Sequence, residues 1–160
     1  MDDFLSDFNR TLDEAERRLT GVTAERAARV VAGGWSASQI LGHLIDSAAN
    51  NHQRFVRAQF SDDLDYPGYE QEQWVRAQHY ETEPWGRLLA LWLAYNRHLA
   101  HVVAGIAPET LSRPRARHSL DRIAWRRVPA EQPATLEYLI RDYLGHLQEH
   151  VGQVVTAVEG

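Results

Sequence analysis

Apolar residues recur every three or four positions over four long stretches of the chain, which is the pattern of amphipathic helices. The first stretch runs from Phe4 to about Gly21. A short helical piece is expected at 23–30, and the pair Gly33-Gly34 that follows favours a turn. Stretches with the alternation of a β-strand are nearly absent, so the pattern predicts an all-α protein.

The second long helix is expected from about Ser36 to Phe60. Its start resembles a capping box, because the Ser36 hydroxyl can accept from the backbone amide of Gln39 while the Gln39 side chain reaches back to Ser36. Trp35, directly before the cap, can form half of a hydrophobic staple. These signals indicate where the helix begins.

His43 lies at one edge of the apolar face of this second helix, and Ser47 and Asn51 follow on the same edge. Small polar residues at such positions are expected where a helix lines a polar cavity instead of a dry seam. A hydrogen-bonded structural histidine at the boundary of the apolar face fits the pattern equally well. His43 alone therefore does not distinguish the two interpretations.

Residues 61–68 read as an exposed loop with a turn, and a short helix is expected at 70–78. The third long helix then opens with Thr82 as its N-cap and a proline in its first turn. His98 flanks its apolar face and is ambiguous. That face comprises Leu88, Leu91, Trp92, Tyr95, Leu99, Val102 and Ile106.

Residues 112–128 form a basic segment in a chain that is otherwise acidic. The segment contains one acidic residue, Asp121, and six arginines, which are Arg113, Arg115, Arg117, Arg122, Arg126 and Arg127. Such a segment is usually solvated or paired with acidic loops of the same fold, and a role in binding a substrate carboxylate or phosphate is the alternative. Two prolines separate it from the last helix, for which Thr135 is the expected N-cap.

The last helix includes residues 139–155 and carries His146 and His150 one turn apart. Side chains four residues apart lie about 5–6 Å from each other at Cβ, so two neutral imidazoles can converge on one divalent ion. Both histidines lie at the edge of one broad apolar arc on the helix surface, so we expect their side chains to point toward the inside of the protein. The arc consists of Leu139, Ile140, Tyr143, Leu144, Leu147, Val151, Val154 and Val155.

Four long helices with one long crossover connection and short extra helices predict a four-helix bundle. With 160 residues and 18.3 kDa, the chain is expected to form a single domain over residues 1–160. The net charge of −5 argues against nucleic acid as a partner. The acidic start of the chain and the lack of a long apolar run argue against a signal peptide and a membrane span, so a cytoplasmic protein with a small-molecule substrate is expected.

The chain contains no cysteine, so any metal must be held by imidazole or carboxylate groups. A four-helix bundle can hold a metal between facing helices, and His43 can supply a third imidazole beside His146 and His150. Three histidines leave one coordination position open for water or a substrate thiolate. Ser47, Asn51 and Tyr143 are then expected to line the approach as substrate-binding residues. Trp74 is expected to close over it.

Glu149 and Asp142 are the candidates for a catalytic base. Residues 146–150 match the H-x-x-E-H pattern of inverted zinc peptidases, in which Glu149 would act as general base. Those enzymes take a third ligand from well downstream, whereas ten residues follow His150 here. A solvated Glu149 is the simpler interpretation.

Three segments together resemble the DinB/YfiT-like superfamily: GWSASQILGHLIDS, YPGYEQEQWVRAQHY and YLGHLQEHVGQV, which occur in this order over nearly the whole chain. The resemblance implies a four-helix bundle with a metal triad at His43, His146 and His150, and it suggests a homodimer. Zinc is the expected metal, with nickel and iron as alternatives.

Proteins of that superfamily include S-transferases that use bacillithiol or mycothiol, a mycothiol-dependent maleylpyruvate isomerase, and metal-dependent hydrolases. The resemblance therefore implies a metal-dependent enzyme, and we expect an S-transferase that uses a low-molecular-weight thiol as its cofactor. A metal-dependent hydrolase is the first alternative. A non-enzymatic metal-binding protein induced by damage or stress is the second, since fold alone does not choose among them.

Overall fold

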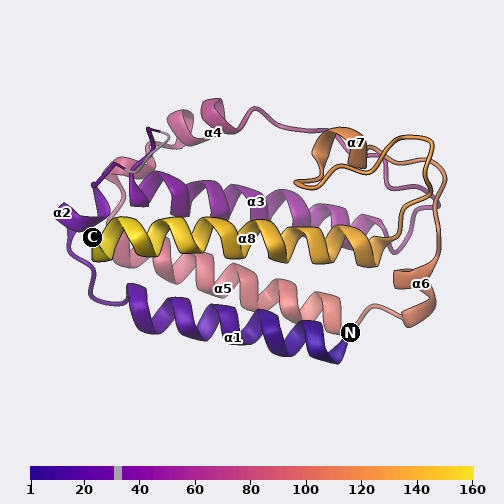
Figure 1. Ribbon diagram of the computed structural model, residues 1–160, viewed down its shortest axis with the longest axis horizontal. Coiled ribbons are helices and arrows are strands. Elements are labelled where there is room, and N and C mark those ends of the chain that lie inside the picture. The colour runs from indigo at the N-terminus through magenta and orange to yellow at the C-terminus, as the bar shows by residue number, and fades with distance from the viewer. Residues whose placement is uncertain (31–33) are drawn as a thin grey trace.

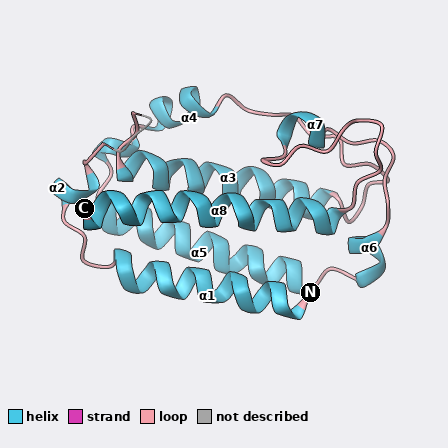
Figure 2. Ribbon diagram, in the orientation of Figure 1, coloured by secondary structure: helices cyan, strands magenta, loops and turns pink. Residues whose placement is uncertain are grey.

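The computed structural model describes residues 1–30 and 34–160, and four long helices form its bundle (Figure 1). They are α1 (Asp2–Leu19), α3 (Ala37–Arg57), α5 (Trp85–Ala104) and α8 (Leu136–Glu159). Each of α1 and α3 packs against both α5 and α8, so α1 and α3 lie diagonally across the bundle. The predicted four-helix bundle is confirmed, and Figure 2 shows helices joined by loops with no strand among the described residues.

The long helices do not alternate strictly up and down. Arg115 donates to the carbonyl oxygens of Ala58 at 2.9 Å and Thr110 at 3.5 Å, so the C-terminal ends of α3 and α5 lie at the same end of the bundle. The start of α5 meets the end of α1, where the Trp85 indole donates to the Leu19 carbonyl at 2.9 Å. Consequently α3 and α5 run parallel, and two connections are long where the sequence suggested one.

Five short helices lie in the described parts of the connections. They are α2 (Ala24–Ala27), α4 (Gln71–Gln78), the 3₁₀-helix η1 (Tyr80–Thr82), α6 (Pro108–Ser112) and α7 (Leu120–Ile123). The helix expected at 70–78 is confirmed, and the one expected at 23–30 is shorter than predicted. Gly33, part of the expected glycine turn, lies outside the described residues. The prediction missed η1, α6 and α7, because a helix of about one turn is too short to show a helical period.

The N-caps differ in how well the sequence predicts them. Ser36 forms the expected capping box, accepting from the Gln39 amide at 3.3 Å while its own amide donates to the Gln39 side chain at 2.9 Å. Thr135 caps α8 by accepting from the Tyr138 amide at 3.1 Å. The prediction that Thr82 caps α5 is wrong: its hydroxyl donates to the preceding turn, and α5 begins only after Pro84.

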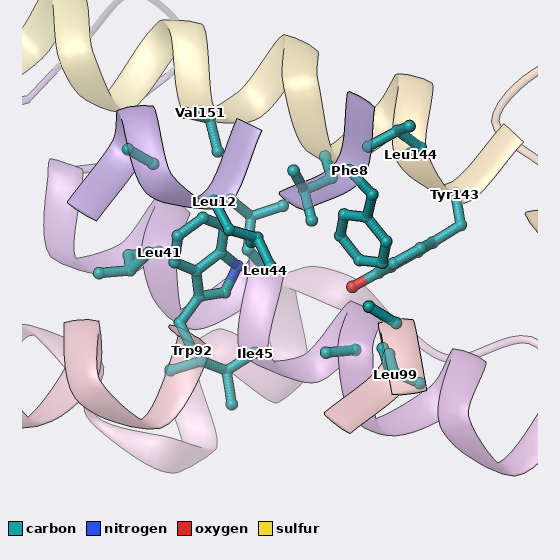
Figure 3. Close-up of a cluster of buried hydrophobic side chains, with 14 of the residues drawn as sticks. Phe8, Leu12, Leu41, Leu44, Ile45, Trp92, Leu99, Tyr143, Leu144 and Val151 are labelled. Carbon is teal, nitrogen blue, oxygen red and sulfur yellow. The ribbon is translucent and has the colours of Figure 1, made fainter. Parts of the chain in front are cut away.

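Side chains from all four long helices fill the core (Figure 3). Tyr143 of α8 is buried in this core. The rings of Phe8 and Phe55 pack edge-on against the Tyr143 ring, at centroid distances of 6.2 and 5.8 Å. Leu91 was predicted to be buried but is 50% exposed. Because α5 packs against both α1 and α3, its buried face instead includes Leu93.

None of the helices in the described part of the chain is long and apolar enough to cross a membrane.

Candidate metal centre

Three histidines from two helices converge between α3 and α8. His43 lies near the start of α3, and His146 and His150 lie one turn apart on α8. One ring nitrogen from each lies within 4.8 Å of the others, and the Nε2 atoms of His43 and His146 are 3.2 Å apart. The antiparallel arrangement of α3 and α8 thus brings together side chains that are more than 100 positions apart in the sequence.

Each imidazole is held by a different contact. The His43 ring is 1% exposed and packs against Trp35 at a centroid distance of 5.3 Å, while its Nδ1 has no hydrogen-bond partner among the described residues. His146 packs against Trp125 at 6.3 Å. His150 donates from Nδ1 to the Gln153 side-chain oxygen at 3.0 Å, which leaves the lone pair of its Nε2 free.

The environment keeps the three imidazoles neutral. Burial lowers the pKa of His43 to about 4, with a smaller contribution from His150. Burial also lowers the pKa of His146 to about 3, assisted by the two other histidines. For His150, burial lowers the pKa, while the bond to Gln153 and the charge of Glu149 oppose the shift. Neutral imidazole is the form that ligates a metal, so all three are in the ligating state at pH 7.

The donor set fits a divalent metal such as zinc. Two nitrogens bound to a tetrahedral zinc at about 2.0–2.1 Å would lie roughly 3.3 Å apart, close to the 3.2 Å between His43 and His146. Among the described residues, no carboxylate joins the three imidazoles as a ligand, and three imidazoles leave a coordination position open, which is the pattern of catalytic rather than structural sites. The same set suits nickel and iron.

A cavity of about 320 Å³ leads away from the histidines between α3, α8 and the segments over them. His146 and His150 line it, whereas His43 lies behind them. Figure 1 shows α7 and its flanking loops beside this part of the bundle. The remaining lining residues are Ser47, Asn51, Arg54, Tyr69, Gln71, Arg122, Ile123, Ala124, Trp125, Arg127, Leu139, Asp142 and Tyr143.

Three of the four residues expected to bind substrate lie in this lining: Ser47, Asn51 and Tyr143. The Tyr143 hydroxyl is already engaged, since it donates to the Asn96 side chain at 2.5 Å. Trp74 does not border the cavity. It packs on the outside of Tyr69, at a ring centroid distance of 4.9 Å, so the aromatic side chain that the middle segment contributes to the cavity wall is Tyr69. Substrate binding by these residues remains a prediction.

The two candidates for a catalytic base lie in different places. Glu149 is exposed on α8 and outside the cavity lining. Asp142 lines the cavity, and its two oxygens accept from the backbone amides of Trp125 and Arg126, each at 2.8 Å. Burial raises the pKa of Asp142, and these two hydrogen bonds oppose the shift. Asp142 therefore positions the segment that carries Trp125.

The other histidines lie away from the triad. His52 and His98 pack together at 5.2 Å between ring centroids, and His101 stacks near His98, on the outer side of α3 and α5. His79 is exposed at the end of α4, with a positive φ of 52°. His118 is buried and accepts from the Leu120 amide at 3.2 Å, so its role is structural.

Two of the six arginines of the basic segment, Arg122 and Arg127, reach the cavity. Arg113 and Arg117 pair with Asp62 and Asp65 of the loop at 61–68, which confirms the expected pairing with an acidic loop of the same fold. Arg115 is buried against backbone carbonyls, and Arg126 stacks over the Trp125 ring at 4.7 Å.

Sequence reasoning missed Arg54, which is buried in the cavity wall. A signal was present: Arg54 lies eleven residues after His43, close to three full turns, so it lies only about 20° from His43 around the helix axis. Trp125 was also missed. Its ring lies over Gly145, where a Cβ would approach Trp125 to 3.1 Å, and that contact depends on which loop packs on α8.

Comparison with known proteins supports the fold and the family. A search of curated protein sequences finds no match. Among solved structures, the chain is similar to YfiT from Bacillus subtilis, a probable metal-dependent hydrolase with an unusual four-helix bundle topology. The TM-score is 0.79 at 17% sequence identity, and the match covers 99% of this chain and 85% of that one. The family model of the DinB superfamily matches residues 7–154. With nearly the whole chain matched and a three-histidine site between α3 and α8, this protein belongs to the DinB superfamily.

Proposed function

We propose that this protein is a metal-dependent S-transferase that uses an external low-molecular-weight thiol. The observation that supports this function is an all-histidine site that opens onto a cavity with no free carboxylate. Among the described lining residues, Asp142 is the one acid, and both of its oxygens accept from backbone amides. A site that binds its own nucleophile needs no strong base beside the metal, whereas activation of water for hydrolysis benefits from one.

The chemistry follows from what the site offers and what the chain lacks. A divalent ion held by His43, His146 and His150 would lower the pKa of a bound thiol, so that the thiolate forms near neutral pH. The thiol would release its proton to solvent, its sulfur would form a bond to the electrophilic carbon of a second substrate, and the leaving group would depart with the electron pair of the broken bond. The chain has no cysteine, so the sulfur nucleophile comes from outside.

The residues around the cavity have matching tasks. Tyr69 and Trp125 form aromatic walls on the side away from the core and exclude water from the reacting sulfur. Gln71 offers an amide group to polar parts of the thiol, whereas the Asn51 amide already bonds to Ser47 and Arg54 and shapes the wall beside it. The resemblance to bacillithiol- and mycothiol-dependent enzymes makes such thiols the first candidates for the cofactor.

A metal-dependent hydrolase is the second candidate, because YfiT carries that description and because Asp142 is an acid in the cavity lining. In this alternative, water takes the place of the thiol and Asp142 accepts its proton. Burial raises the pKa of Asp142, which suits that role. A non-enzymatic metal-binding role is the third candidate, and turnover of any substrate would rule it out.

The test begins with cobalt-loaded protein titrated with bacillithiol, mycothiol and 2-mercaptoethanol. We expect a thiolate-to-cobalt absorption band in the near ultraviolet with at least one of the larger thiols. The same thiol should then be consumed in a metal-dependent reaction with a chromogenic aryl halide. If no thiol changes the spectrum while esters or amides are hydrolysed in a metal-dependent way, the hydrolase alternative is correct.

Variants separate the triad from other histidines. His43→Ala should lose most of its metal, measured by elemental analysis, because two imidazoles hold a divalent ion much more weakly than three. His52→Ala, on the same helix but outside the triad, is the matched control and should retain the metal. Full metal content in His43→Ala would contradict the assignment of the site.

A further inference from the structure

Arg54 places a buried positive charge in the cavity wall. Its side chain is 6% exposed and donates to the Asn51 side-chain oxygen at 3.4 Å and to the Pro67 carbonyl at 3.1 Å. Both acceptors are neutral, and among the described residues no carboxylate lies within ion-pair distance of Arg54. A guanidinium has five N–H donors, and buried charges in proteins are usually paired. Arg54 therefore retains donors for a group that is not part of the chain.

The cavity connects Arg54 to the histidines. Along α3, Arg54 follows His43 by eleven residues, which is about 16 Å along the helix axis. The guanidinium contacts Asn51, which lies about one turn closer to His43. The distance from the guanidinium to the triad, measured along the helix axis, is therefore on the order of 10 Å. On α8, residues from Leu139 to His150 line the same cavity over a similar length. One extended small molecule can span both ends.

The charges around the cavity favour an anion with a single negative charge. Arg54 is the buried cation of the lining, it contacts the neutral amide of Asn51, and Gln71 adds a second neutral amide to the lining. Arg122 and Arg127 are exposed at the edge of the cavity, where solvent screens their charges, and Arg122 is already paired with Asp65 and Asp121. The carboxylate of Asp142 is already held by two backbone amides. One planar guanidinium suits a carboxylate, whereas a doubly charged phosphate is usually met by more than one buried cation.

We propose that the small molecule bound at the histidine site carries a carboxylate, and that Arg54 binds this carboxylate about 10 Å from the sulfur end. This inference rests on the proposed function in one respect, which is that the other end of the molecule binds the metal. Arg54 is then the residue that selects carboxylate-bearing substrates and sets their length.

The experiment compares thiols that differ at the far end. Cobalt-loaded protein is titrated with 8-mercaptooctanoate, which spans about the required length, and with 8-mercaptooctanol, in which a hydroxyl replaces the carboxylate. We expect the carboxylate to bind about tenfold to a hundredfold more tightly, the usual range for a charge-assisted hydrogen bond. The short 3-mercaptopropionate should show no dependence on Arg54, because it cannot reach both ends.

Arg54→Gln should remove the preference for the carboxylate while leaving the affinity for 8-mercaptooctanol unchanged. Glutamine keeps an amide that can donate to the Pro67 carbonyl, and circular dichroism checks that the variant is folded. Arg57→Gln is the matched control, since Arg57 is exposed on the same helix. Equal affinity of the wild type for the two thiols, or a preference that survives Arg54→Gln, would overturn the proposal.

A second measurement separates this proposal from the proposed function. Octanoate, octanol and octyl phosphate are titrated into metal-free protein while tryptophan fluorescence is followed, because Trp125 borders the cavity. An Arg54-dependent preference for octanoate supports the carboxylate site even if no thiol binds the metal. No preference for octanoate over octanol, or stronger Arg54-dependent binding of octyl phosphate, rejects it.

Discussion

Gly42 has to be a glycine because the ring of Tyr80 occupies the space of its missing side chain. A Cβ at this position would lie 2.6 Å from Cε2 of Tyr80 and closer still to two other ring carbons. Tyr80 is buried in η1, and its hydroxyl donates to the Asp46 carboxylate at 2.7 Å. Gly42→Ala therefore cannot be accommodated unless the ring, and with it η1, moves away from α3.

The size of the effect follows from two opposing contributions. Alanine is favoured over glycine inside a helix by up to about 1 kcal/mol. Overpacking usually costs about 1–3 kcal/mol, and displacing the Tyr80 hydroxyl from the buried Asp46 costs about 1–3 kcal/mol more. We therefore expect Gly42→Ala to lower the free energy of unfolding by about 1–5 kcal/mol, which for a chain of this size corresponds to a Tm lower by about 2–20 °C.

The measurement is urea and thermal unfolding beside a matched control. Gly152→Ala is also a helical glycine, but nothing lies within 4 Å of the added Cβ, so this variant should be as stable as the wild type or more stable. In a Tyr80→Ala background, Gly42→Ala should no longer be destabilising, which gives a coupling energy of about 1 kcal/mol or more. The reasoning is refuted if Gly42→Ala is as stable as Gly152→Ala.

Two further predictions concern the cavity and the triad. Asp142→Ala should release the backbone of Trp125 and Arg126, lowering the free energy of unfolding by about 1–2 kcal/mol and shifting tryptophan fluorescence to the red; Glu149→Ala, on the same helix, should change neither. In metal-free protein the pKa values of His43 and His146 are about 4 and about 3 against 6.5 in the unfolded chain, so the unfolded state binds more protons below pH 6.5. The urea midpoint should therefore fall from pH 7 to pH 4.5, and less steeply in His146→Gln; an equal slope in both proteins would contradict it.

Local signals in the sequence predicted most of the bundle. The Ser36 capping box and the Thr135 cap fixed the starts of α3 and α8, because a cap depends on residues within one turn. The spacing of His146 and His150 identified one half of the site for the same reason. The choice of His43 as their partner rested on its position at the edge of α3 and on the family resemblance.

Features that depend on packing between distant segments could not be predicted from the hydrophobic pattern of the sequence. Helical periodicity locates the faces of one helix but not which loop covers them, so the burial of Arg54 beneath Pro67 was not foreseen. Likewise, Asp142 was predicted as a candidate base, and its hydrogen bonds to the amides of Trp125 and Arg126 depend on a segment that is distant in the sequence. Leu91 was misplaced because the pattern of α5 does not reveal that two helices share its buried face.

The long separation of the ligands along the chain affects how a metal would act on stability. His43 and His146 are 103 positions apart, so the unfolded chain must close a loop of that length before the two can share an ion. Closing a loop of about 100 residues carries a large entropic cost, estimated at about 4.7 kcal/mol for cross-links. The unfolded chain therefore competes poorly for the ion, and nearly all of the binding free energy adds to the stability of the native state. In a chain without cysteine, a metal at this site would hold the first and last thirds of the sequence together as a disulfide does elsewhere.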